Sequence, residues 1–140
     1  MSLKNLDNLV KTGQLKLESF NKQEFAGMVT SGKARLKDAE NQTLSLESRF
    51  DLAYGAAHAL SLAALRWHGY RSNHRYIVFQ VLPYTLGLSS EMCRILSKCH
   101  DRRNLAEYEG HLEVEEQLLK DLIKVTHNVL ANLTQYAENI

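Results

Sequence analysis

Apolar residues recur along most of this chain at intervals of three and four. This is the spacing of helices that bury one face. We find none of the alternating apolar and polar runs that predict half-buried strands, and the sequence contains a single proline, Pro83. The pattern therefore predicts an all-α chain, and it also indicates where each helix begins and ends.

Helix-stop and helix-start residues divide the pattern into segments. Gly13 and Gly69 are typical of residues that follow a helix, Ser89 or Ser90 is typical of a residue that precedes one, and Pro83 should kink or end the helix that contains it. We expect 14–20 to be an extended connector and 70–74 to be a polar loop. The predicted helices span 3–12, 22–40, 46–68, 75–86, 91–108 and 113–137.

Short connections between amphipathic helices favour antiparallel neighbours. The helix over 46–68 carries six alanines between positions 53 and 64, which permit close approach of another helix. We therefore expect an antiparallel up-down bundle of four to five main helices. We assign 1–20 to an N-terminal helix and connector appended to the bundle, and 21–140 to a single bundle domain.

The composition is that of one ordinary globular domain. The chain has 140 residues, of which 44% are hydrophobic and 24% charged, so it can bury a core without disulfides or metal. Cys93 and Cys99 are six residues apart in one predicted helix and are interpreted as reduced thiols. No signal peptide and no apolar run of about 18 residues is present, which favours a cytoplasmic protein without a membrane partner.

The net charge of +1 gives no reason to expect a nucleic acid or membrane partner, but the charge is unevenly distributed. Between Leu60 and Asn104, seven Lys or Arg face two acids, whereas between Leu105 and Asp121 six acids face one lysine. Two explanations account for this pattern. Either solvated helix faces pair with each other, or a basic binding surface lies next to an acidic segment.

Two arginines continue an apolar stripe of the helix over 91–108. Met92, Ile95, Leu96 and Cys99 follow helical spacing, and the next positions on that face are 102, 103 and 106. We therefore expect Arg102 or Arg103 to face the core or a cleft. A buried guanidinium stays charged and needs carboxylate, phosphate or carbonyl partners, which makes this segment the main functional candidate.

A polar stripe runs beside these arginines. Glu107, one turn beyond Arg103, can hold its guanidinium, while Asn104 and Tyr108 present an amide and a phenol on adjacent turns. Such an array suits a phosphate with a flanking base or sugar; the alternative is a structural Arg–Glu pair with a tyrosine at the rim of the bundle. The members of the stripe are His100, Arg103, Asn104, Glu107, Tyr108 and His111.

The remaining histidines point to no metal site, because no His-x3-His or Cys-x2-Cys spacing occurs. His58 and His68 are interpreted as hydrogen-bonded core or rim residues. His74 lies in a predicted loop near Arg71 and Arg75, where it either caps the next helix or joins an anion site. We expect no metal and no cofactor.

The segment RRNLAEY at 102–108 resembles the motif of the HEPN family of helical-bundle domains. A supporting match is RFDLAYGAAH at 49–58, followed by Gly69-Tyr70-Arg71 and His74, and the resemblance covers about 25–133. It implies a four- to five-helix up-down bundle, often a homodimer whose facing motif helices build one cleft. HEPN members include metal-independent endoribonucleases, many of them toxins or defence effectors, and inactive relatives that bind RNA, nucleotides or a partner protein.

One position departs from the motif of the active members, in which an arginine and a polar residue precede a histidine. Arg103 and Asn104 match the first two positions, but Tyr108 stands where the histidine is expected, and His111 is one residue too far. His100 has the right spacing from Arg94, but an isoleucine follows that arginine. Tyrosine, with a pKa near 10, is a poor base at neutral pH, whereas phosphate binding by arginine does not require the histidine.

Three functional hypotheses follow. The first is an RNA- or nucleotide-binding module, without strong catalysis, that holds phosphate in a dimer cleft. The second is a metal-independent endoribonuclease of toxin or defence type, in which Arg103 acts with Tyr108, His100 or His74. The third is an interaction domain for a partner or antitoxin protein, with arginines that pair with the acidic segment 107–121 across a dimer. The predicted ligand-binding residues are Arg102, Arg103, Asn104, Glu107, Tyr108, Arg71 and His74.

Overall fold

Side-chain caps fix the start of three long helices. The Asn21 Oδ1 accepts a hydrogen bond from the Glu24 N–H at 2.9 Å, and the side chains of Ser45 and Ser89 play the same role for the two helices that they precede. The computed structural model describes residues 2–110 and 113–138. Its elements are α1 (Ser2–Lys11), β1 (Lys16–Leu17), α2 (Lys22–Ala39), α3 (Leu46–Trp67), β2 (Tyr70–Arg71), α4 (Arg75–Gln80), α5 (Leu82–Thr85), α6 (Ser90–Glu109) and α7 (Glu116–Ala137).

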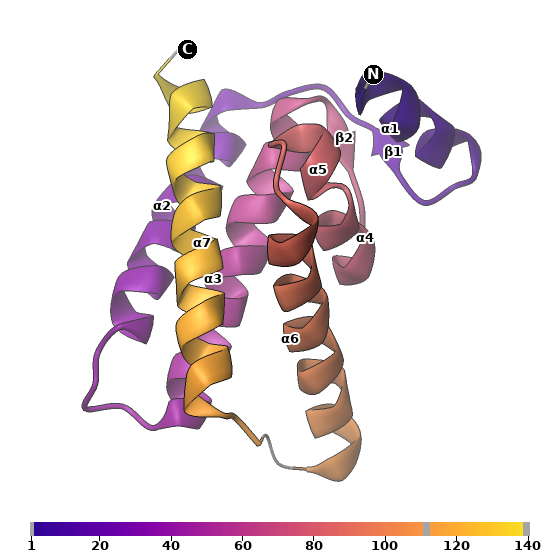
Figure 1. Cartoon of the computed structure of the whole chain (residues 1–140). Coiled ribbons are helices and arrows are strands. Elements are labelled where there is room, and N and C mark those ends of the chain that lie inside the picture. The colour runs from indigo at the N-terminus through magenta and orange to yellow at the C-terminus, as the bar shows by residue number, and fades with distance from the viewer. Residues whose placement is uncertain (1, 111–112, 139–140) are drawn as a thin grey trace.

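The four long helices α2, α3, α6 and α7 form an antiparallel up-down bundle, which confirms the predicted all-α fold (Figure 1). Figure 1 shows α2 and α6 on opposite sides of α3, with α7 packed across the front. The core is built from the buried face of α3 and the apolar stripe of α7. In α7 the buried hydrophobic residues are Leu118, Leu119, Leu122, Val125, Val129 and Leu133. No helix among the described residues is long and apolar enough to cross a membrane.

Helices α2 and α3 approach closely at Gly32, which is buried. A Cβ atom at this position would lie 2.6 Å from both Cγ and Cδ2 of Leu60, a side chain with no exposed surface. The glycine therefore sets the distance between the two helices.

We expect Gly32→Ala to lower the free energy of unfolding by about 1–3 kcal/mol, because the new methyl group forces Leu60 out of a packed position. Gly27→Ala is the matched control, since it lies in the same helix and an added Cβ meets no atom within 4 Å. This control should gain about 0.5–1 kcal/mol from helix propensity. Urea denaturation followed by circular dichroism measures the free energy of unfolding of both variants. An equal change in Gly32→Ala and Gly27→Ala would show that the helices do not touch at Gly32.

The segment predicted as one helix over 75–86 consists of two short helices. The break lies at Val81 rather than at Pro83, which occupies the first turn of α5. Proline has no N–H, and its ring clashes with the carbonyl four residues earlier, here that of Phe79, so the chain must leave the helix before Pro83. The last helix also begins later than predicted, at Glu116 instead of 113.

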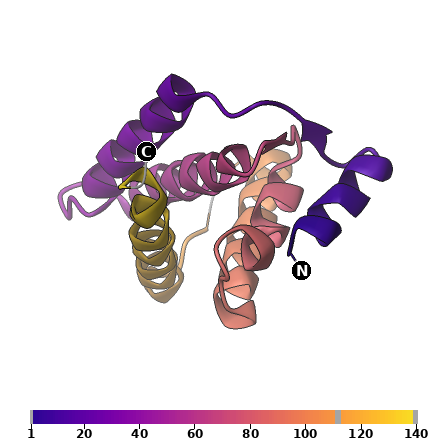
Figure 2. The same cartoon turned by 90° about the horizontal axis from the view of Figure 1, so that it is seen from above.

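The N-terminal segment packs onto the bundle. Strand β1 pairs antiparallel with β2, so that Lys16 lies opposite Arg71 and Leu17 opposite Tyr70. The prediction of 70–74 as a polar loop is therefore wrong at its first two residues, and Tyr70 is buried. Figure 2 shows α1 beside α4 and α5, on the side of the bundle away from α2 and α7. A second small core lies between the N-terminal segment and the bundle. Its buried residues are Leu6, Leu15, Leu65, Tyr70, Val78 and Val81.

The most deeply buried charged side chain of the described residues belongs to Arg66 in α3, with 1% of its surface exposed. Its Nε donates to Glu24 Oε1 at 2.7 Å, its Nη2 to the Ser19 carbonyl at 2.6 Å, and its Nη1 to the carbonyls of Glu18 at 2.8 Å and Tyr70 at 3.2 Å. One guanidinium thus holds the connector, the two-stranded sheet and α2 together.

Candidate functional site

One face of α3 collects polar groups from three other helices. Asp51, Tyr54, Gly55 and His58 follow the spacing i, i+3, i+4, i+7, which places them on the same side of the helix. Gly55 has no side chain, so the helix backbone is open to neighbours at that point. The groups that approach this face come from α2, α4 and α6.

Three arginines approach this face, each from a different helix. Arg103 of α6 pairs through Nε with Asp51 Oδ1 at 3.1 Å, and Arg75 of α4 has its Cζ 5.8 Å from the centroid of the Tyr54 ring. The Nη1 of Arg35 in α2 lies 3.3 Å from the position that a Cβ would take at Gly55. We refer to Arg35, Arg75 and Arg103 as the arginine cluster.

The arginine cluster carries more positive charge than its surroundings neutralise. Within residues 2–110 and 113–138, Asp51 is the one carboxylate in an ion pair with any of the three guanidinium groups. Burial lowers the pKa of the neighbouring His58 imidazole to about 4. The positive charges of Arg75 and Arg35 lower this pKa further. His58 is therefore neutral at neutral pH, and the cluster is a site of surplus positive charge.

The imidazole of His100 is fixed at both ring nitrogens. Its Nδ1 lies 3.0 Å from the Tyr54 hydroxyl, and its Nε2 lies 3.0 Å from Asn104 Nδ2. Because an amide nitrogen only donates, Nε2 accepts and the ring hydrogen is on Nδ1. The Tyr54 oxygen then accepts from Nδ1, which leaves its own hydroxyl hydrogen available to another acceptor.

The Tyr54 hydroxyl remains protonated in this environment. Burial raises its pKa, and this outweighs the opposing effect of Arg75 and Arg103. The arrangement around this face of α3 therefore offers guanidinium groups and a neutral phenol as donors. These are the groups that recognise phosphate oxygens.

The two arginines that interrupt the apolar stripe of α6 have different partners. Arg102 donates to the Glu113 carbonyl at 3.0 Å and to Glu115 Oε1 at 3.2 Å, which ties the end of α6 to the residues before α7. The interpretation of Glu107 as the partner of Arg103 is wrong, because α3 presents Asp51 to this guanidinium while Glu107 stays exposed.

The predicted polar stripe of α6 is divided between two environments. His100 and Arg103 contact Tyr54 and Asp51 of α3. Asn104 is exposed and contacts His100 within α6, and Glu107 and Tyr108 project into solvent. The side chain of Tyr108 is 89% exposed. His111, the last member of the stripe, lies outside the described residues. The phenol that belongs to this face is therefore that of Tyr54, not that of Tyr108.

Arg71 and His74 lie apart from these contacts. The Arg71 guanidinium is held by two carboxylates, those of Glu18, at 2.7 Å from Nε, and Glu24. His74 precedes α4 but its side chain makes no capping hydrogen bond. Arg71 thus extends the carboxylate network of Arg66 and is part of the packing of the N-terminal segment.

Sequence reasoning missed Arg35, Arg75, Asp51 and Tyr54 as members of a site. A signal existed for the last two, because Asp51 and Tyr54 continue the spacing of His58 along one helix face. Nothing in the pattern of α2 indicates that Arg35 reaches α3.

The thiols are chemically quiet. Burial raises the pKa of Cys99 to about 12, which lowers the reactivity of this thiol. Burial also raises the pKa of Cys93. Neither cysteine forms a disulfide. Among the residues that the structure describes, no group of three His, Cys, Asp or Glu side chains is arranged to hold a metal ion.

The sequence was compared with protein-family models and with curated proteins. No family model matches the chain, and no curated protein matches it either.

Proposed function

We propose that this protein is a HEPN-like module that binds the phosphate of an RNA or a nucleotide in the arginine cluster, without strong catalysis. The observation that carries the proposal is the convergence of three guanidinium groups, from α2, α4 and α6, with Asp51 as their one carboxylate partner among the described residues. A bound phosphate supplies the missing negative charge.

Groups beside the cluster fit the rest of such a ligand. The free hydroxyl hydrogen of Tyr54 is a donor to a phosphate oxygen, and the ring of Tyr76 is 41% exposed next to His100, with ring centroids 5.7 Å apart. An exposed aromatic ring beside a cation is a common surface for stacking a nucleobase.

Binding is favoured over cleavage for a chemical reason. Cleavage by the ribose 2′-hydroxyl needs a group that takes its proton, and the histidine nearest to Arg103 is His100. The acceptor nitrogen of His100 already accepts a hydrogen bond from Asn104, so it is not free to take a proton. Tyr108, one turn beyond Asn104, is exposed to solvent.

The proposal includes a homodimer with facing α6 helices. The exposed apolar surface on the C-terminal half of α6 supports this dimer, because Leu105 is 50% exposed and Tyr108 is 89% exposed. Large exposed side chains next to each other are typical of contact surfaces. In such a dimer, the two arginine clusters would line one cleft.

We expect Arg75→Gln to weaken binding of a short 5′-phosphorylated RNA about tenfold, equivalent to about 1.4 kcal/mol. Fluorescence anisotropy measures the affinity. Lys37→Gln is the matched control, because it removes the same charge from the exposed side of α2. Equal weakening in both variants would assign binding to net charge alone and overturn the proposal.

The same protein and RNA, incubated in EDTA and analysed on a gel, test the alternative function. Intact RNA supports a binding module. Cleavage that Arg103→Ala abolishes would instead establish an endoribonuclease. Absence of any RNA or nucleotide binding by the folded protein would favour an interaction domain.

A further inference from the structure

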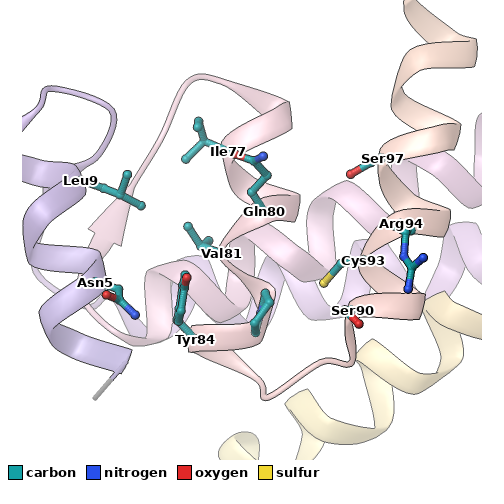
Figure 3. A pocket seen from close by; sticks show the side chains of 11 residues that line it. Asn5, Leu9, Ile77, Gln80, Val81, Tyr84, Ser90, Cys93, Arg94 and Ser97 are labelled. Carbon is teal, nitrogen blue, oxygen red and sulfur yellow. The ribbon is translucent and has the colours of Figure 1, made fainter.

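A cavity lies between α1 and α6, and none of its lining residues belongs to the arginine cluster. Its floor is formed by α4 and α5 (Figure 3). The volume of the cavity is about 540 Å³, within the range of small-molecule sites. The N-terminal helix closes one side of it, so the cavity exists because residues 2–17 pack onto the bundle.

The lining of this cavity is apolar on one side and polar on the other. Leu9, Ile77 and Val81 contribute hydrocarbon surface, and the Cys93 thiol points into the space from α6 (Figure 3). Gln80 contributes a neutral hydrogen-bonding group. Such a surface favours a ligand with an apolar body.

Of the described residues that line the cavity, Arg94 is the one that carries a charge. The structure records no ion pair or hydrogen bond of its side chain with any described residue. Figure 3 shows Arg94 on α6, with Leu9 across the cavity on α1. A ligand that spans the cavity would thus meet one cation and an apolar wall.

We infer that this cavity binds a small amphipathic monoanion, of the class of short aliphatic or aromatic carboxylates. Arg94 holds the carboxylate through its paired N–H donors, and the side chains of Leu9, Ile77 and Val81 surround the hydrocarbon. One guanidinium matches one negative charge, which favours a carboxylate over a phosphate dianion. The inference does not depend on phosphate binding by the arginine cluster.

Octanoate is the probe, and its affinity is measured by isothermal titration with the full chain. We expect Arg94→Gln to weaken octanoate binding about tenfold and to leave octanol binding unchanged, because the alcohol has no charge to lose. Lys98→Gln is the matched control, since it removes an exposed cation one turn further along α6 that does not line the cavity. The inference is overturned if the unmodified protein, Arg94→Gln and Lys98→Gln bind octanoate equally well. It is also overturned if octanol binds as tightly as octanoate.

A second measurement locates the probe. Octanoate should slow the alkylation of Cys93 by iodoacetamide, whereas Cys99, which has no exposed surface, does not react in the folded protein. Cys93→Phe fills the cavity and should abolish octanoate binding while the thermal unfolding transition stays cooperative. Undiminished binding in this folded variant would place the ligand elsewhere and refute the assignment.

Discussion

We expect Arg66→Ala to lower the free energy of unfolding by about 3–5 kcal/mol, the largest effect of any single substitution considered for this chain. The substitution removes the Arg66 donor from the carbonyls of Glu18, Ser19 and Tyr70 and removes one of the two arginine partners of Glu24. The carbonyl of the buried Tyr70 loses its donor without gaining water, and the part-buried contacts to Glu18 and Ser19 are replaced by water only in part. Urea denaturation followed by circular dichroism measures the loss.

Arg71→Ala is the matched control. Arg71 pairs with the carboxylates of Glu18 and Glu24, which also lie within 4 Å of the Arg66 guanidinium, but a quarter of the Arg71 side chain is exposed. We expect this variant to lose at most about 1 kcal/mol, since water replaces the guanidinium. A similar loss in both variants would mean that the carbonyl contacts of Arg66 contribute little, and that ion pairing alone stabilises the N-terminal segment.

The long helices could be predicted because their signals are local. Apolar spacing, the caps at Ser45 and Ser89, and the glycine after α3 all act within one or two turns of the chain. The two-residue strands β1 and β2 could not, because two residues carry no periodicity. They pair only because Arg66 and the small core around Tyr70 bring them together.

The candidate site was predictable in part. A cation on an apolar stripe must find a partner, and this reasoning led to Arg103, which pairs with Asp51. The same reasoning applied to Arg66, between Leu65 and Trp67, would have found the most deeply buried cation. Arg35 and Arg75 could not be found in this way, because they are exposed residues whose common target lies on another helix.

The charge balance at Arg103 leads to the second large effect. We expect Arg103→Ala to weaken RNA binding about 100-fold, equivalent to about 2.7 kcal/mol, ten times more than Arg75→Gln. The variant loses one cation and also leaves the carboxylate of Asp51 facing the phosphate without a partner. The carboxylate and the phosphate are both negative, so they repel each other once the guanidinium between them is gone. Fluorescence anisotropy at constant salt measures the loss.

A double-mutant cycle separates the two contributions. Asp51→Asn alone should tighten RNA binding several-fold, because it frees the Arg103 guanidinium for the phosphate. The double variant should bind only about tenfold more weakly than the unmodified protein, since the repelling carboxylate is gone as well. If Asp51→Asn weakened binding, the aspartate would contact the ligand or hold Arg103 in its binding position. An unchanged affinity in Arg103→Ala would contradict the arginine cluster as the RNA site, whatever the overall charge contributes.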